Sequence, residues 1–142
     1  SARSCAGLAR SIVDLATGPH ADSVWVLDSE RELLLIDALD RVVWRSATGF
    51  DARALAPIPS AELVWVTDSH APRARRLGRI DGGHTDSLEC SDFGTTAAEC
   101  AVGLPGGGVL FALPGALVHR DERGRPSPGQ GGFHTLVDVA PR

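Results

Sequence analysis

The densest group of charged side chains lies at residues 73–79, which read Arg-Ala-Arg-Arg-Leu-Gly-Arg. A guanidinium group forms paired hydrogen bonds with a carboxylate or a phosphate, so this segment could be a docking patch for an acidic partner. The alternative is an exposed outer strand, with Arg75 and Arg79 on one face and Arg76 on the other. Carboxylates that could pair with these arginines inside the chain are Asp81, Asp86 and Glu89. The predicted partner-binding residues are Arg73, Arg75, Arg76 and Arg79.

A second candidate for chemistry is a repeated acidic residue. Asp28-Ser29 and Asp68-Ser69 each follow an apolar run, and two carboxylates in matching places could act as a pair. An Asp directly after an apolar strand more often accepts hydrogen bonds from backbone N–H groups and shapes a turn. We therefore expect a structural role for both residues.

The histidines and cysteines do not form a metal-binding pattern. The five histidines are His20, His70, His84, His119 and His134. None has zinc-ligand spacing with another His or Cys, and a site built from His84, Cys90 and Cys100 would have to be assembled over a distance. Cys90 and Cys100 bracket a short loop and could form a disulfide in an oxidising compartment; the alternative is reduced thiols, some of them buried as small hydrophobes. Cys5 has no evident partner, and no metal or cofactor is predicted.

Composition argues against several functional classes. The 142 residues are 43% apolar and 23% charged, as in an ordinary globular protein. A formal net charge of −4 is too small to imply nucleic acid or a membrane surface as a partner, and no apolar run is long enough for a membrane span. The absence of Lys excludes a phosphate-loop lysine and Schiff-base chemistry. Because the chain does not begin with Met, we expect a processed chain or a piece of a longer one.

A six-residue sequence motif that occurs twice indicates the kind of fold that positions these residues. Residues 24–29 read Val-Trp-Val-Leu-Asp-Ser, and residues 64–69 read Val-Trp-Val-Thr-Asp-Ser. The residues before the motif match as well, in the pairs Leu15 and Leu55, Ala16 and Ala56, Pro19 and Pro59, and Asp22 and Glu62. Self-similarity at about this period is the signature of a repeat architecture.

Each unit of the repeat reads as short strands separated by polar or Gly- and Pro-rich turns. The predicted strands of the first unit are residues 11–16, 23–27, 32–36 and 41–45. Those of the second unit are 53–56, 63–67, 75–80 and one within 85–93. The third unit has strands at 100–102, 109–113 and 116–120, and 133–139 is its last strand or opens a fourth unit.

The repeat also predicts which aromatic residues are buried, and one segment allows an alternative secondary structure. We expect Trp25 and Trp65 to be buried in equivalent places, with Phe111 in the corresponding place of the third unit. Residues 29–38 contain good helix formers, so a helix there is the alternative to a strand.

Four short strands in about forty residues form the pattern of one propeller blade. The predicted fold is all-β, with about three four-stranded β-propeller blades and part of a fourth. The predicted divisions are an extension at 1–10, blades at 11–52, 53–99 and 100–135, and a further blade or last strand at 136–142. About three blades and a fragment cannot close a ring, so an open propeller would leave two blade faces exposed. We expect either a larger propeller, or a second copy or another protein that completes it; two copies would form a seven-bladed ring.

Two groups of families resemble these units. Residues 63–69, Leu-Val-Trp-Val-Thr-Asp-Ser, and residues 79–82, Arg-Ile-Asp-Gly, resemble blades of the NHL, gluconolactonase-like and YWTD propellers. Residues 108–112, Gly-Val-Leu-Phe-Ala, with Val-His-Arg at 118–120, Pro-Gly at 128–129 and the aromatic Phe133, resemble tectonin-type repeats. Both resemblances imply propeller blades.

The main functional prediction is a non-enzymatic scaffold or protein-interaction module, the role expected of a propeller without a recognisable active site. One alternative is a metal-dependent lactonase- or hydrolase-type enzyme, which the gluconolactonase-like resemblance implies. Those enzymes hold a divalent metal with Glu, Asp and Asn, and this chain has no Asn. The other alternative is a lectin-like propeller that binds glycans or lipids, which the tectonin resemblance implies. No catalytic residue is predicted.

Overall fold

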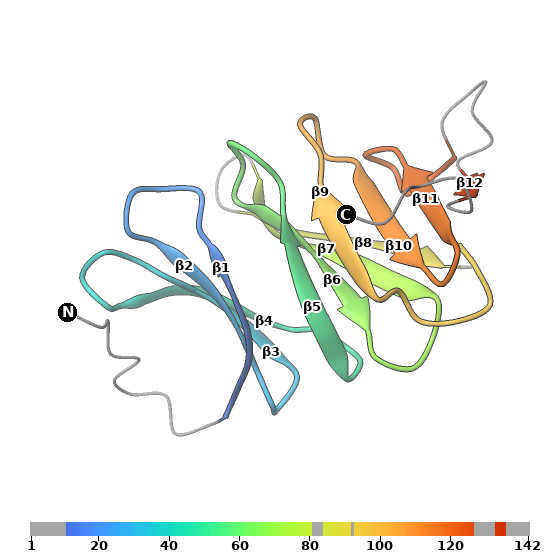
Figure 1. Cartoon of the computed structure of the whole chain (residues 1–142). Coiled ribbons are helices and arrows are strands. Elements are labelled where there is room, and N and C mark those ends of the chain that lie inside the picture. The colour runs from blue at the N-terminus through green and yellow to red at the C-terminus, as the bar shows by residue number, and fades with distance from the viewer. Residues whose placement is uncertain (1–10, 81–83, 92, 127–132, 136–142) are drawn as a thin grey trace, which may run out of the picture.

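The computed structural model describes residues 11–80, 84–91, 93–126 and 133–135, which form an all-β fold with no helix among them. Three four-stranded antiparallel sheets follow one another along the chain (Figure 1). The first sheet contains β1 (Ile12–Thr17), β2 (Val24–Asp28), β3 (Glu32–Ile36) and β4 (Val42–Ala47). The second contains β5 (Ala52–Pro57), β6 (Leu63–Asp68), β7 (Arg73–Ile80) and β8 (His84–Ser91). The third contains β9 (Cys100–Gly103), β10 (Val109–Leu113), β11 (Ala116–Arg120) and β12 (Phe133–Thr135).

The strands predicted from the repeat are confirmed, with ends that differ by a few residues. The helix alternative at residues 29–38 is wrong, because β3 places its side chains with the two-residue period of a strand. Leu33 and Leu35 face the second sheet, whereas Leu34 and Ile36 face the opposite side. Of the predicted strand 133–139, β12 occupies the first three residues, and residues 136–139 lie outside the described part of the chain.

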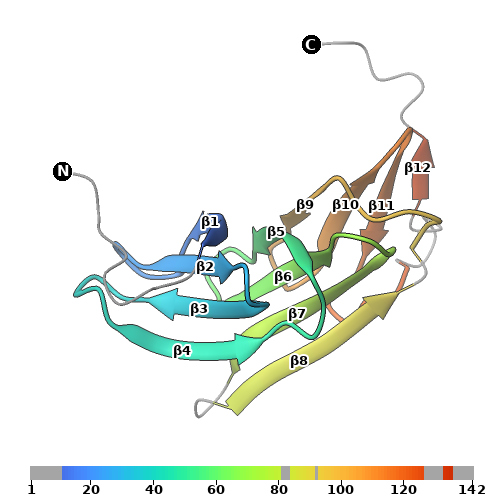
Figure 2. The ribbon, with the colours of Figure 1, turned by 90° about the horizontal axis from the view of Figure 1, so that it is seen from below.

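The three sheets lie side by side in the order of the chain (Figure 2). The first strands of the sheets, β1, β5 and β9, are neighbours in that order. Within each sheet the chain then moves strand by strand away from this row, so that β4 and β8 lie on the outside. None of the three described sheets closes on itself.

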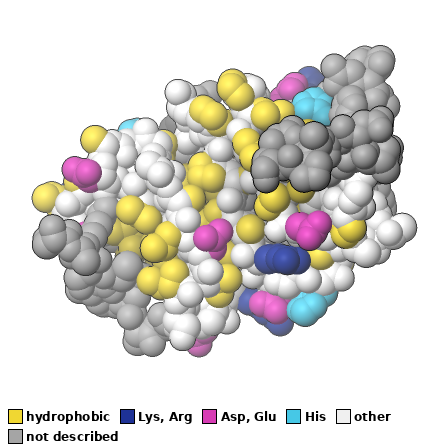
Figure 3. Space-filling model, in the orientation of Figure 1, with side chains coloured by type: hydrophobic (Ala, Val, Ile, Leu, Met, Phe, Trp, Pro, Cys, Tyr) yellow, Lys and Arg dark blue, Asp and Glu magenta, His cyan; other side chains and the backbone are white. Residues whose placement is uncertain are grey.

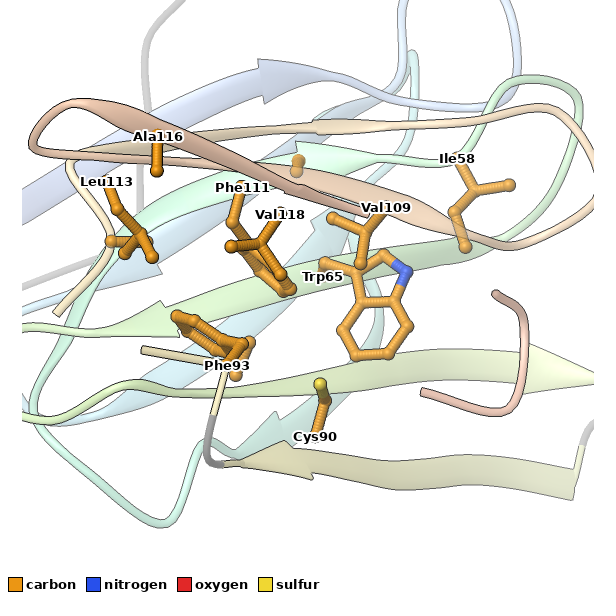
Figure 4. Close-up of a cluster of buried hydrophobic side chains, with 12 residues drawn as sticks. Ile58, Trp65, Cys90, Phe93, Val109, Phe111, Leu113, Ala116 and Val118 are labelled. Atoms are coloured by element: carbon orange, nitrogen blue, oxygen red, sulfur yellow. The ribbon is translucent and has the colours of Figure 1, made fainter. Parts of the chain in front are cut away.

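Two apolar cores hold the sheets together. Between the first and second sheets, Trp25 and Trp44 pack edge to face, 5.9 Å apart between ring centres, against Val64 and Val66. Between the second and third sheets, the Trp65 ring packs against Phe111 (Figure 4). Trp25 and Trp65 are therefore buried in matching places, as expected: each pairs with the alanine of the preceding strand and faces the next sheet.

The expected equivalence of Phe111 with the two tryptophans is wrong. Val109 is the first residue after the β9–β10 turn, as Val64 is after the β5–β6 turn, so Leu110 matches Trp65 and Phe111 matches Val66. Phe111 accordingly faces back toward the second sheet and meets Trp65 there. The prediction aligned Phe111 with the tryptophans because all three are aromatic, which is one residue away from the register of the strands. Side chains alternate between the two faces of a strand, so a shift of one residue reverses the face.

Candidate functional site

The four arginines of β7 are all paired with carboxylates inside the chain. The ion pairs are Arg73–Asp68 at 2.7 Å, Arg75–Glu89 at 2.9 Å, Arg76–Asp86 at 2.8 Å and Arg79–Glu62 at 2.6 Å. Asp86 and Glu89 are partners that the sequence suggested, whereas Asp81 lies outside the described residues. Each of the four predicted partner-binding arginines is therefore already engaged by a carboxylate inside the chain, and Glu89 lies directly opposite Arg75 on β8. Binding of an acidic partner at these arginines stays a prediction.

Two of these arginines also connect sheets. Arg75 donates from Nη1 to the carbonyl of Thr48, at the end of the first sheet, at 3.0 Å. Arg76 lies on the opposite face, where it donates to the carbonyl of Glu122 beyond β11. Arg75 and Arg76 thus lie on opposite faces of β7, as predicted, and each contacts a different neighbouring sheet.

The close approach of Arg75 explains a glycine in the connection between sheets. Gly49 has a φ of +86°, a conformation that disfavours residues with a Cβ. A Cβ at this position would also collide with the Arg75 guanidinium. Gly49 thus permits the chain to cross from β4 to β5 directly beneath the arginine.

Asp28 and Asp68 shape turns, as expected. Asp28 accepts hydrogen bonds at Oδ1 from the amides of Glu30 and Glu32, both at 3.0 Å. Asp68 accepts from the amide of His70 at 2.8 Å and from Arg73. Burial would raise the pKa of Asp68, but the His70 amide and the Arg73 guanidinium outweigh it and hold that pKa below its usual range. Both carboxylates stabilise the loop after the second strand of their sheet.

Glu62 connects the turns of two sheets. It accepts hydrogen bonds from Arg79, within its own sheet, and pairs with His20 of the β1–β2 turn at 2.9 Å. Burial would raise the pKa of Glu62, but the hydrogen bonds from Arg79 and His20 outweigh it and lower the pKa. This His–Glu–Arg arrangement lies on the surface and ties the first sheet to the second.

The disulfide that the sequence allowed between Cys90 and Cys100 is not formed. Cys90 is buried on the outer strand β8, where its Sγ lies 3.5 Å from the carbonyl of Gly124. Cys100 is exposed at the start of β9, in the row of first strands. Their strands lie at opposite edges of adjacent sheets, so the loop between them does not bring the thiols together. Among the described residues no three His, Cys, Asp or Glu side chains are placed to hold a metal ion.

A groove that the sequence analysis missed lies between the first two sheets. It has a volume of about 530 Å³ and is lined by residues 16–19 before the β1–β2 turn, residues 57–60 in the β5–β6 turn, and Trp25. These residues are uncharged, and three of them are prolines. The signal in the sequence was the pairing of Gly-Pro and Pro-Ile-Pro turns at equivalent places beside the repeated tryptophan.

The two repeated tryptophans differ in their hydrogen bonding. The Trp65 indole donates from Nε1 to the carbonyl of Gly107, in the turn of the next sheet, at 3.1 Å. The Trp25 indole nitrogen is buried and has no hydrogen-bond partner among the described residues. A buried unpaired N–H group costs free energy, about 1–3 kcal/mol, so this difference between matching positions is an unusual feature of the fold.

No protein-family model matches the chain, and no curated protein matches it either. Among solved structures, the chain is similar to "Structure of U3-55K", with 8% sequence identity and a TM-score of 0.48. The match covers 82% of this chain and 50% of that one, so the chain spans about half the length of U3-55K. This likeness is too weak to name a family. In the part of the chain that the structure describes, there is no helix of the length and apolarity that a membrane span requires.

Proposed function

We propose that the three sheets are successive blades of a β-propeller that further sheets complete, and that the protein is a non-enzymatic scaffold or interaction module. Support comes from the sheets themselves. Each is a four-stranded meander, and the first two share the same register of buried positions. Two adjacent sheets bury large apolar faces against each other, which is how blades pack.

The observation that carries the proposal is a contrast between matching residues at the ends of the row. Leu15 and Leu55 occupy the same place in the first and second sheets. Leu55, which packs against the first sheet, is 8% exposed, whereas Leu15 is 51% exposed because no described sheet precedes its own. Apolar side chains accordingly gather on the surface over the first sheet (Figure 3).

The other end of the row shows the same contrast. Val102 matches Ala56 by register, on the face that points toward a following sheet. Ala56 is 1% exposed in the core beside the third sheet, and Val102 is 58% exposed. The two end positions therefore have the chemistry of internal sheet faces without the sheets that would cover them, which favours association with a second copy or with sheets of another protein.

Sedimentation velocity tests the proposal. Leu15→Arg and Val102→Arg each place a charge on one end face, and each is expected to reduce association of the chain at micromolar concentration. The matched control is Leu39→Arg, which alters an exposed leucine in the β3–β4 turn and is expected to leave association unchanged. A stable, compact monomer whose behaviour none of the three substitutions alters would contradict the proposal.

A further inference from the structure

The two ends of the row of sheets are the two halves of a junction that the chain builds twice. At each internal junction, one face of a sheet packs on the opposite face of the next sheet. The first sheet leaves one of these faces, with Leu15, without a described neighbour, and the third sheet leaves the other, with Val102. The sheet that covers the Leu15 end must therefore resemble the third sheet, and the sheet that covers the Val102 end must resemble the first.

The first strands show how these two ends would meet. At the first junction, Asp14 on β1 accepts a hydrogen bond at Oδ2 from the amide of Leu55 on β5, at 3.0 Å. By register, Cys100 has on β9 the place that Asp14 has on β1. Leu15 likewise has on β1 the place that Leu55 has on β5. In a junction of the same kind, Cys100 of one copy would lie beside Leu15 of the next copy.

A polar side chain on the third sheet extends the match. At the second junction, Arg76 crosses to the carbonyl of Glu122 in the turn after β11. His119 has the place of Arg76 in the third sheet, because it pairs with Leu110 as Arg76 pairs with Trp65. A hydrogen-bond donor is thus present on the end face at the position where the chain uses one internally.

The acceptor that matches this histidine lies at the other end of the row. Asp37 and Asp121 follow the third strand of their sheets, and each accepts hydrogen bonds at Oδ1 from the amides two and four residues later. The two turns therefore correspond, and the carbonyl of Ala38 has the place of the Glu122 carbonyl. The ends of the row match in a polar contact as well as in apolar residues.

We propose that a second copy of the chain docks head to tail, with the third sheet of one copy against the first sheet of the next. This docking rests on the proposed scaffold role and identifies its partner as the chain itself. It covers Val102 and Leu15 in one contact and brings His119 to the carbonyl of Ala38. A head-to-tail contact forms a ring when its rotation closes. Two copies contain six described sheets, three in each, and propellers have about four to eight blades, so no other protein is required for a ring.

Disulfide trapping tests this geometry in chains that carry Cys5→Ser. One protein carries Leu15→Cys and Cys100→Ser, and the other retains Leu15 and Cys100. The two are mixed at micromolar concentration with diamide, which takes up the two thiol hydrogens, and are expected to form a disulfide-linked pair that peptide mass spectrometry assigns. Each protein alone should form far less, because like faces do not meet. Asp14 stays partly exposed at the first junction, so Cys100 remains accessible to the reagent in the assembly.

A matched control uses the middle sheet. Ile80→Cys with Cys100→Ser places a thiol at a residue about as exposed as Leu15 but away from both ends, and it should not form the link. In sedimentation, His119→Glu should weaken association by about three- to tenfold, the loss of one hydrogen bond, whereas His119→Gln retains a donor and should weaken it less.

The outcomes separate this docking from the scaffold role on which it rests. A link no stronger than that of the Ile80→Cys control, or stronger linking of either protein alone than of the mixture, would overturn head-to-tail docking. If Val102→Arg still reduced association in that case, the scaffold role would be retained with a different contact. A chain that does not associate at all would contradict both.

Discussion

The guanidinium of Arg76 lies over the ring of Trp65, 5.9 Å from its centre. Arg76 also pairs with Asp86 and donates to the carbonyl of Glu122, and the indole donates to the next sheet. A cation above an indole ring is attracted to its π face, most strongly where water is excluded. A residue that looked like part of a charged surface is thus part of the junction between two sheets.

We predict that Arg76→Met destabilises the fold by about 3 kcal/mol, because it leaves Asp86 without its partner in a site where both side chains are at most 15% exposed. The double variant Arg76→Met/Asp86→Leu should recover part of this loss, since it also removes the Asp86 carboxylate that would otherwise be left unpaired. Urea unfolding measures both. Arg41→Met, which breaks the exposed pair with Asp37, is the control and should cost at most about 0.5 kcal/mol.

Reversal of Arg73, Arg75 and Arg76 to Glu together should prevent stable folding rather than remove a partner-binding site. Each new carboxylate would face an existing one, at Asp68, Glu89 or Asp86. Thermal unfolding followed by circular dichroism provides the measurement. A triple variant that unfolds at the temperature of the parent chain would show that these internal pairs contribute nothing, and would restore the arginines as a free surface.

Alanine substitutions at Trp25, Trp65 and Leu110, the matching positions of the three sheets, test the strand register by the stability that each one costs. Trp25→Ala and Trp65→Ala are each expected to cost about 3–5 kcal/mol, because both rings are fully buried between sheets. Leu110→Ala should cost clearly less, since this matching position faces away from the second sheet and is only partly buried. Chemical denaturation of the three variants gives the comparison, and equal losses at all three positions would contradict the register.

Stability should fall at acidic pH in a way that depends on Glu62. Its pKa is lowered in the folded state from a starting value of 4.5. A lowered carboxyl pKa contributes stability that is present above the unfolded pKa and is lost as the pH falls through the folded pKa. Glu62→Gln should therefore flatten the pH dependence below about 4.5 and leave the slope above it unchanged. Urea midpoints from pH 3 to 7 measure the effect, and parallel curves for both proteins would contradict it.

The cysteines should differ in reactivity when Cys5 is first replaced by Ser. Cys100 is exposed and should react with a thiol reagent in the folded protein, whereas buried Cys90 should react only after unfolding. Mass spectrometry after alkylation distinguishes the two sites. Protection of both thiols in the folded, non-reduced protein, with release on reduction, would indicate the disulfide that the structure lacks.

The strands and the buried tryptophans could be predicted from the sequence because they depend on local patterns. Short apolar runs between Gly, Pro and Asp residues define strands, and the repeat of residues 24–29 at 64–69 places Trp25 and Trp65 in the same position of successive sheets. The turn role of Asp28 and Asp68 is equally local, because each carboxylate bonds amides within a few residues.

The partners of the arginines and the face of Phe111 depended on the tertiary structure. Arg75 and Arg76 find their further acceptors, the carbonyls of Thr48 and Glu122, on other sheets, and no local pattern specifies which sheet covers which face. Phe111 was misplaced by one residue because the β9–β10 turn is one residue shorter than its counterpart. Since side chains alternate along a strand, that single residue decides whether the ring points forward or back, and only the pairing of β9 with β10 resolves it.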